Sequence, residues 1–288
     1  MSIERKAAMN QYGTSYKRGT LFFNQETKHD TYILYTFLRV IDNIVDNPAT
    51  DLQDAARAVN QLRDQFHTLY NHTAPIDNLL LQETVHLAHK YDMPATWFND
   101  FFDAMLADTK QTTYETYEQL QWYMRWSACV VWLMMTKIIW YDTAYEEETF
   151  AAATQLGEAM QYTNFLRDIK EDWLEYWRLY IPSDRLAAFS CSQHMIKNFA
   201  TWTPISTQRR DFMDYQITHL QDQYAQANKG IKQLNPQWRL PVLIASNLYA
   251  RILKRIKQLW GDVFTRSART KPYEKILTLI GTIATYKF

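Results

Sequence analysis

Apolar residues recur at spacings of three and four along most of the chain, as in Ile33, Phe37, Ile41 and Ile44. This spacing is typical of the buried face of an α-helix. Sustained alternation of apolar and polar residues, which would indicate strands, is scarce. The pattern predicts helices over residues 28–46, 51–71, 77–92, 95–108, 116–141, 146–177, 204–228, 238–260 and 271–286.

Prolines mark the boundaries between these helices, because a proline interrupts helical hydrogen bonding. Seven of the eight lie beside turn-like stretches: Pro48, Pro75, Pro94, Pro182, Pro204, Pro236 and Pro272. The eighth, Pro241, lies close to a helix start expected near residue 238, where proline is tolerated. There is no low-complexity linker and no internal repeat, so residues 1–288 predict a single all-α domain.

The composition indicates a large core, since 47% of the residues are apolar and 15% are aromatic. Such an aromatic excess suits a helical bundle that encloses an apolar cavity, although large cores also use aromatic side chains. Lys and Arg together number 31, as do Asp and Glu. This balance argues against nucleic-acid binding, which normally requires a basic surface.

The charge is nevertheless unevenly distributed, because residues 251–271 contain seven basic residues and one acid, Asp262. The basic residues are Arg251, Lys254, Arg255, Lys257, Arg266, Arg269 and Lys271. A run of this kind is most often a solvated helix face. The functional alternatives are a wall that binds a diphosphate and a contact with an anionic membrane surface.

Cysteine usage and hydropathy both indicate a cytoplasmic protein. Cys129 and Cys191 do not form a disulfide framework, which favours a reducing compartment. Residues 1–10 are charged and have no apolar signal core. The most apolar segment, residues 128–140, is shorter than the ~20 residues of a spanning helix and is interrupted by Lys137. We therefore expect no transmembrane anchor.

A first pair of carboxylates lies late in the helix predicted over residues 28–46. Asp42 and Asp46 are four residues apart, so both project from one face of a helix. Like charges at this spacing destabilise a bare helix, and a bridging divalent cation would remove that cost. The pair alone fits a solvated acidic helix end equally well.

A second polar stripe is harder to explain as packing. Gln161, Asn164, Asp168 and Asp172 are spaced by three, four and four residues in a helix whose other positions are apolar or basic. Two amides and two carboxylates in a row need polar partners when they are buried. A metal ion would supply such partners.

Two stripes of this kind on separate helices could face each other across a cavity. Mg²⁺ is the expected metal, because it takes hard oxygen ligands and shares its coordination shell with phosphates. Metal ions there would neutralise the charge on a departing diphosphate, and aromatic faces in an apolar pocket would stabilise the carbocation left behind. The residues therefore predict ionisation of an allylic diphosphate.

With both segments in view, the chain resembles the squalene/phytoene synthase family over most of its length. Residues 34–46, LYTFLRVIDNIVD, are similar to the family's YAFCRxxDDxVD motif. Residues 161–172, QYTNFLRDIKED, resemble its QxTNxxRDxxED motif, and residues 178–182, RLYIP, its RxYLP run. The resemblance implies an isoprenoid-synthase-type helical bundle around a central cavity. It also implies head-to-head joining of two farnesyl or geranylgeranyl diphosphates, through a cyclopropyl diphosphate, to a phytoene-, dehydrosqualene- or squalene-type product.

The resemblance also implies roles for individual residues. The implied Mg²⁺ ligands are Asp42, Asp46, Asn164, Asp168 and Asp172. The implied catalytic residues, tyrosines at the reaction centre and arginines on the diphosphates, are Tyr35, Arg39, Tyr123 and Arg167. The implied substrate contacts are Ser15, Tyr16, Gln161, Arg178, Tyr180, Tyr249 and Arg266.

Several positions depart from the family's pattern. Asn43 stands where the family often has a second aspartate, but it lies off the face that Asp42 and Asp46 share. Trp132 occupies a glycine position in a run of small residues, where it would fill part of the hydrocarbon channel, and Trp177 likewise replaces a glycine. These changes leave the metal chemistry intact and bear on substrate length and product.

Two alternative functions follow from these departures. A cavity narrowed by Trp132 and Trp177 favours a terpene cyclase-like enzyme, or another prenyltransferase, acting on one allylic diphosphate. A non-catalytic helical relative is the other alternative, and the four intact aspartates argue against it. NADPH would be a second cofactor if the product is squalene, and an apolar product favours peripheral contact with a membrane. The sequence leaves the general base, the chain length and the oligomeric state open.

Overall fold

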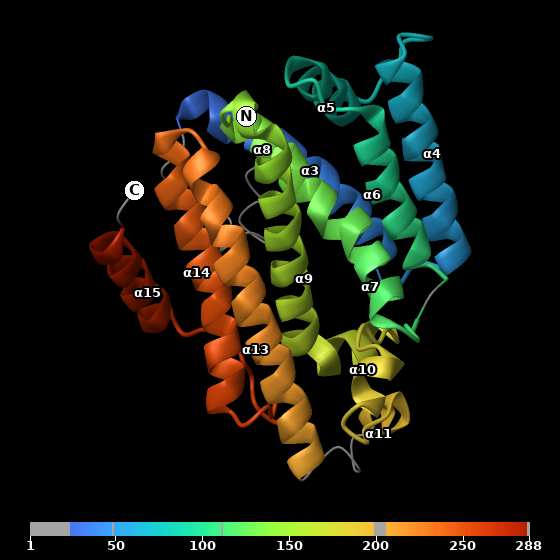
Figure 1. Ribbon diagram of the computed structural model, residues 1–288. Coiled ribbons are helices and arrows are strands. Elements are labelled where there is room, and N and C mark those ends of the chain that lie inside the picture. Colours follow the sequence, from blue (N-terminus) through green and yellow to red (C-terminus); the bar gives the residue numbers. More distant parts are fainter. Residues whose placement is uncertain (1–23, 48, 111, 199–205, 287–288) are drawn as a thin grey trace.

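The computed structural model describes residues 24–47, 49–110, 112–198 and 206–286, which are mainly helical (Figure 1). The longer helices are α3 (Gln25–Val45), α4 (Leu52–Tyr70), α5 (Leu79–Lys90), α6 (Ala95–Ala107), α7 (Tyr117–Met124), α8 (Val130–Ile139), α9 (Glu146–Tyr176), α13 (Thr207–Lys229), α14 (Pro236–Gln258) and α15 (Pro272–Thr285). The shorter ones are η2 (Arg125–Cys129), η3 (Thr143–Tyr145), α10 (Ser183–Ala187), α11 (Gln193–Lys197) and η4 (Gly230–Gln233). Within the described residues, β pairing is limited to two isolated bridges.

The predicted all-α fold is confirmed, with three differences in detail. The helix expected over residues 116–141 is divided into α7, a π-helical turn (η2) and α8. The short helices α10 and α11 were not predicted. Pro241 lies inside α14, which already begins at Pro236, and it is buried.

Side-chain caps explain where several helices begin. Asn24, Asp51, Asn78 and Ser206 each accept a hydrogen bond from a backbone N–H in the first turn of the helix that follows. Thr116 forms a complete capping box with the first turn of α7. Each such cap satisfies a backbone donor that has no partner within the helix, so local sequence fixes these boundaries.

An aromatic cluster joins α3, α4 and α6. The rings of Phe66 and Phe98 stack with centroids 4.6 Å apart. Phe37 on α3 meets Phe98 and Phe102 edge to face, with centroids 5.7 Å apart in both pairs. All four side chains are fully buried. This packing fixes the position of α3, whose other residues carry the first aspartate pair.

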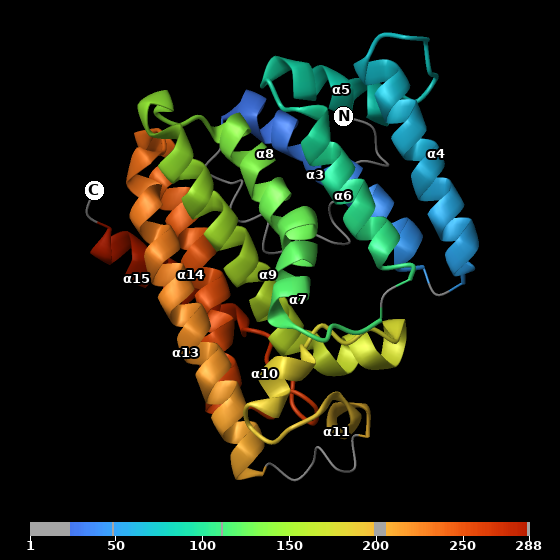
Figure 2. The ribbon, with the colours of Figure 1, turned by 45° about the vertical axis from the view of Figure 1, so that its right-hand side comes forward.

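Helix α9 lies at the centre of the bundle, between α8 on one side and α13 and α14 on the other (Figures 1 and 2). It approaches η2 closely at Gly157. A Cβ atom at this position would lie 3.0 Å from Cα of Cys129, 3.1 Å from the carbonyl oxygen of Ala128 and 2.9 Å from Cδ1 of Trp132. Glycine is therefore required at this contact by packing, rather than by its backbone angles.

The C-terminal part of the chain covers the far side of α14. Helix α15 packs against α14, and α14 packs in turn against α9 and α13. In both views α15 lies at the edge of the bundle, remote from α4 and α5 (Figures 1 and 2). No described helix combines the length and the apolar character needed to span a bilayer.

Candidate active site

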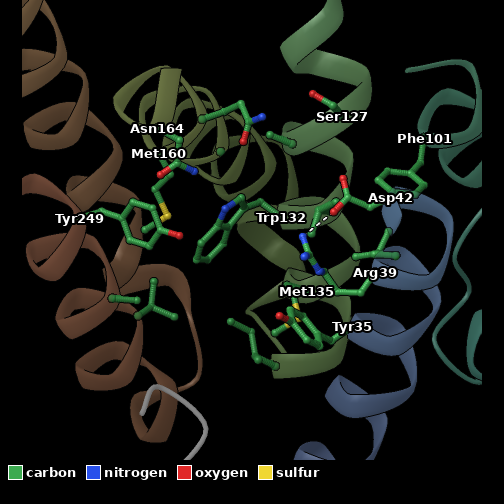
Figure 3. Close-up of a pocket in the computed structure, with 18 of the residues that line it drawn as sticks. Tyr35, Arg39, Asp42, Phe101, Ser127, Trp132, Met135, Met160, Asn164 and Tyr249 are labelled. Carbon is green, nitrogen blue, oxygen red and sulfur yellow. Dashed lines mark hydrogen bonds and ion pairs between the residues drawn. The ribbon is translucent and has the colours of Figure 1, made fainter. Parts of the chain in front are cut away.

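A cavity of about 370 Å³ lies between α3, α6, α8, α9 and α14 (Figure 3). Its wall is mainly apolar, with polar side chains from α3 and α9. The lining residues from α3 and α6 are Tyr35, Leu38, Arg39, Asp42, Phe101 and Met105. Those from α7, η2 and α8 are Tyr123, Ser127, Ala128, Val131, Trp132, Met135 and Ile139. Those from α9 and α14 are Gly157, Met160, Gln161, Asn164, Pro241, Val242, Ala245, Leu248 and Tyr249.

The first aspartate pair lies at the C-terminal end of α3. Tyr35, Arg39 and Asp42 line the cavity at spacings of four and three. Arg39 forms an ion pair with Asp42 (Figure 3). Asp46 is the C-terminal cap of the helix. Burial, with the like charge of Asp46, raises the pKa of Asp42 to about 7, against the opposing effect of Arg39. Asn43 is exposed, which confirms that it lies off the shared face.

Arg178 connects the two aspartate motifs. Its Nη1 lies 2.7 Å from Oδ1 of Asp46 and its Nη2 donates to the carbonyl oxygen of Val45 at 3.3 Å. Its backbone N–H donates to the carbonyl oxygen of Asp172 at 3.0 Å. The arginine side chain is buried. The end of α9 is therefore held against the end of α3, so the structure brings together the two motifs that lie over 100 residues apart.

The polar stripe on α9 is divided between two hollows. Gln161 and Asn164 line the cavity, whereas Asp168 lines a second hollow between α9 and residues 263–269. Arg167 donates through Nε to Oδ1 of Asp168 at 2.7 Å. Burial, with the like charge of Asp168, raises the pKa of Asp172 to about 8. Ionisation of Asp172 beside Asp168 is therefore unfavourable in the fold, and a nearby cation would offset that cost.

These donors fit Mg²⁺. Oδ1 of Asn164 is buried and has no hydrogen-bond partner, which is costly unless a ligand supplies one. The raised pKa values of Asp42 and Asp172 mean that a nearby cation would stabilise both carboxylates. Within the described residues, no group of three or more His, Cys, Asp and Glu side chains comes together as a metal cluster. Each aspartate pair alone would therefore leave most coordination positions of a Mg²⁺ ion to water or other oxygen ligands.

A buried carboxylate that the sequence interpretation missed lies behind the cavity. Asp108 accepts hydrogen bonds from the hydroxyls of Tyr123 at 2.7 Å and Tyr180 at 3.0 Å. Its Oδ2 lies 3.9 Å from Nη1 of Arg178. Burial raises the pKa of Asp108 to about 6 despite these partners. The ring of Tyr180 stacks on that of Phe165 with centroids 4.0 Å apart. The hydrogen bond to Asp108 thus holds the hydroxyl group of Tyr123, whose side chain lines the cavity.

The remaining predicted site residues differ in position. Tyr249 lines the cavity from α14, whereas Arg266 lines the second hollow beside Arg167 and Asp168. Tyr180 contacts Asp108 and is absent from the cavity wall. Ser15 and Tyr16 lie outside the described residues.

The two tryptophans that replace family glycines lie in different surroundings, one in the cavity wall and one on the surface. Trp132 lines the cavity, so its predicted place in the channel is confirmed (Figure 3). The prediction that Trp177 narrows the cavity is wrong, since its side chain is 63% exposed. Trp177 caps α9 in the left-handed conformation, with φ of 57°, and packs edge to face on Trp173. Glycine is favoured in that conformation, so this position reflects backbone geometry rather than channel shape.

Known proteins match the chain over nearly its whole length. The squalene/phytoene synthase family model matches residues 9–274. A chloroplastic phytoene synthase of an Oncidium hybrid cultivar is 30% identical over 277 residues, which cover 93% of this chain and 64% of that protein. The chain thus spans slightly less than two thirds of the length of this relative. A 15-cis-phytoene synthase of Synechococcus elongatus is 28% identical, covering 93% of this chain and 88% of that protein.

Solved structures show the same fold. A dehydrosqualene synthase in complex with a ligand superposes with a TM-score of 0.83 and 20% identity, covering 98% of this chain and 94% of that one. The squalene synthase HpnC from Alicyclobacillus acidocaldarius gives a TM-score of 0.78 and 18% identity, covering 89% and 93%. The predicted isoprenoid-synthase-type bundle is therefore confirmed.

Proposed function

The chain belongs to the squalene/phytoene synthase family, and from this premise we propose that it is a Mg²⁺-dependent enzyme that joins two identical prenyl diphosphates head to head. One structural observation supports the proposal independently of family membership. The apolar cavity has acidic and amide groups, Asp42, Gln161 and Asn164, on the two walls formed by α3 and α9. A prenyl diphosphate has the complementary form, an apolar tail that ends in a concentrated negative charge.

The aspartate pairs hold the cations in this proposal. Asp42 and Asp46 on one helix, and Asp168 and Asp172 with Asn164 on the other, would bind Mg²⁺. When bound, the metal supplies positive charge that stabilises the departing diphosphate.

The basic side chains bind and orient the diphosphates. Arg39 lines the cavity beside Asp42, and Arg178 lies between the two motifs. Arg167 and Arg266 line the second hollow. Guanidinium groups suit this role, because they hold phosphate oxygens through two parallel hydrogen bonds.

The apolar wall and the tyrosines guide the hydrocarbon part of the reaction. The C1–O bond of the first substrate breaks and releases diphosphate. The allylic cation alkylates the double bond of the second substrate, and loss of a proton closes the ring of a cyclopropylcarbinyl diphosphate. This intermediate then loses its own diphosphate, and the rearranged cation loses a proton or, for a squalene-type product, accepts hydride from NADPH. The cavity wall excludes water that would trap either cation. Tyr35 and Tyr123 line the cavity, where their aromatic rings would stabilise positive charge. Burial raises the pKa of both phenols, so they remain protonated.

A second candidate function rests on Trp132. Its indole occupies cavity wall next to Gly157, where it reduces the space for hydrocarbon. A cavity that admits only one prenyl chain would favour a terpene cyclase-like enzyme, or another prenyltransferase, acting on one allylic diphosphate.

Product mass distinguishes the two functions. The purified protein is incubated with farnesyl or geranylgeranyl diphosphate and Mg²⁺, with and without NADPH, and the hydrocarbons are analysed by mass spectrometry. A product with twice the carbon atoms of the substrate is expected, and a hydrogen-richer product formed only with NADPH would identify a squalene-type ending. If every product had the same number of carbon atoms as the substrate, head-to-head joining would be overturned.

A further inference from the structure

Helix α15 has its apolar side facing outward. Five large apolar side chains, each 48–61% exposed, repeat at helical spacing on its outer side: Tyr273, Ile276, Leu277, Ile280 and Ile283. An amphipathic helix on the surface of a soluble domain normally turns this side toward the core. Among the described residues, the outer side of α15 therefore lacks the covering that such a stripe normally has.

The inner side of α15 is polar and closely matched to α14. Glu274 is 2% exposed and accepts a hydrogen bond from Nη2 of Arg251 at 3.1 Å. Thr282, also buried, accepts from Nδ2 of Asn247 at 3.0 Å. The orientation of the helix is thus fixed by an ion pair and a hydrogen bond, and it cannot turn its apolar side inward without breaking both. These two contacts therefore hold the apolar side of α15 outward in the folded protein.

The surroundings of this apolar side are basic. Between residues 263 and 286 the only acid is Glu274, which is buried, whereas Lys271 is exposed and Lys275 is half-buried. Arg266 and Arg269 are also exposed but line the second hollow, where Arg269 pairs with Glu171 at 3.1 Å. A second copy of the chain would bring two of these basic segments into one interface, with like-charge repulsion. An apolar stripe with basic flanks matches the chemistry of an anionic bilayer surface.

We propose that α15 attaches this protein to anionic lipid membranes, with Tyr273, Ile276, Leu277, Ile280 and Ile283 inserted among the lipids and Lys271 and Lys275 on the headgroups. The chain lies on the membrane surface, in agreement with the lack of a described helix that could span it. The family match ends at residue 274, so nearly all of this stripe lies beyond it.

The attachment gives the proposed reaction a place to release its product. The face of α14 opposite α15 contributes Val242, Ala245 and Tyr249 to the cavity wall. A single helix, α14, therefore separates the membrane-bound helix α15 from the cavity. This consequence rests on the proposed function, whereas lipid binding itself does not.

Flotation of the full-length protein with lipid vesicles tests the proposal. Vesicles of phosphatidylcholine are compared with vesicles that also contain phosphatidylglycerol, at low and high salt. The wild type is expected to float with the anionic vesicles. The double variant Ile276→Ser/Ile280→Ser should bind about 100-fold more weakly, at about tenfold per side chain. Lys271→Gln/Lys275→Gln should bind about tenfold more weakly and lose much of the salt dependence.

The matched control is Leu52→Ser/Leu79→Ser, which removes two exposed leucines from α4 and α5 at the other side of the bundle. It should float like the wild type. Equal flotation of the wild type and the α15 variant would overturn the proposal. So would a concentration-dependent dimer that the α15 variant disrupts while neither protein floats, because the occupant would then be a second copy.

Turnover separates this inference from the proposed function. When the substrate is dispersed in detergent, the Ile276→Ser/Ile280→Ser variant should retain wild-type activity, because neither residue lines the cavity. A protein that floats but makes no condensed product would retain the membrane inference and lose the proposed function.

Discussion

Arginines act as counter-ions for three of the four aspartates in the two motifs. Arg39 pairs with Asp42, Arg178 with Asp46 and Arg167 with Asp168. Each of these arginines is also positioned to bind a diphosphate in the proposed reaction. In the proposed reaction, a divalent cation bound to these carboxylates would release the guanidinium groups for the phosphate oxygens.

The pH dependence of stability follows from the raised pKa values of three buried carboxylates. Asp108, Asp42 and Asp172 have an ordinary pKa of 3.8 and folded pKa values of about 6, about 7 and about 8. The folded state therefore binds protons more tightly than the unfolded state. Their contribution to stability is complete below pH 3.8 and is lost as the pH rises through the folded values. We expect the Tm of the metal-free protein to fall over this range, measured by circular dichroism with a chelator present.

Mg²⁺ should reverse this trend. Above the folded pKa values Asp42 and Asp172 are ionised and bind the cation best, so added Mg²⁺ should raise Tm more at high pH than at low pH. The variant Asp42→Asn should show a weaker fall of Tm with pH. An Mg²⁺ effect of equal size at all pH values would contradict the assignment of these carboxylates to the metal.

Removing one carboxylate from either pair should abolish turnover. Asp42→Asn and Asp168→Asn each keep the shape of the side chain and lose its charge, so the metal loses a ligand and activity falls by about a thousandfold or more. The helical content should be retained. The control is Asn43→Ala, which alters an exposed neighbour of Asp42. Full activity of either aspartate variant would remove that residue from the metal site.

Asp108 should act as a positioning residue for Tyr123. Asn in its place has a single acceptor oxygen for two phenols, so we expect kcat to fall about tenfold with KM nearly unchanged. Tyr180→Phe, which removes one donor and leaves the bond from Tyr123 intact, should have a smaller effect. A rise in KM at constant kcat in Asp108→Asn would instead indicate a role in substrate binding.

Sequence pattern predicted the aspartates and missed Asp108, for a physical reason. Asp42 and Asp46 repeat at helical spacing, so their shared face is visible in the sequence. Asp108 is a single acid that follows the end of α6, and its partners Tyr123 and Tyr180 come from other segments. Only the packing of these segments shows that the carboxylate is buried.

At the scale of elements, apolar periodicity predicted the longer helices and caps explained several of their ends. The division of residues 116–141 by η2 was not predicted, because a π-turn changes the hydrogen-bond partner without changing the apolar character of the segment. The helices α10 and α11 are each five residues long, which is too short for an apolar face to repeat.

The contact between α9 and η2 yields a prediction about Gly157. In Gly157→Ala the added methyl meets two backbone atoms of η2 and the Trp132 ring at 2.9–3.1 Å, so the helices must separate. We expect the free energy of unfolding to fall by about 1–3 kcal/mol, measured by denaturant titration. Gly281→Ala on α15 is the matched control. It has open space around it and should gain about 0.5–1 kcal/mol from helix propensity. Equal effects of the two variants would contradict the tight contact.

At the scale of the whole molecule, the existence of a central cavity could be predicted from the sequence, but the residues that form its walls could not. The two polar stripes indicated that α3 and α9 face each other, and the family resemblance implied a central cavity. The walls from α6 and α14 follow from three-dimensional packing of ordinary apolar residues such as Phe101 and Val242. The same packing placed Trp132 inside the cavity and Trp177 outside, although both replace family glycines.

The size of the cavity, and hence the chain length that the bundle accepts, should respond to Trp132 and not to Trp177. Trp132→Gly removes an indole from the cavity wall, so the ratio of kcat/KM for geranylgeranyl over farnesyl diphosphate should rise about tenfold or more. Trp177→Gly is the matched control: it loses the same side chain on the surface and relieves a left-handed φ, so the ratio should stay constant while Tm rises slightly. An unchanged ratio in Trp132→Gly would mean that cavity depth is set elsewhere, and the second candidate function would lose its structural basis.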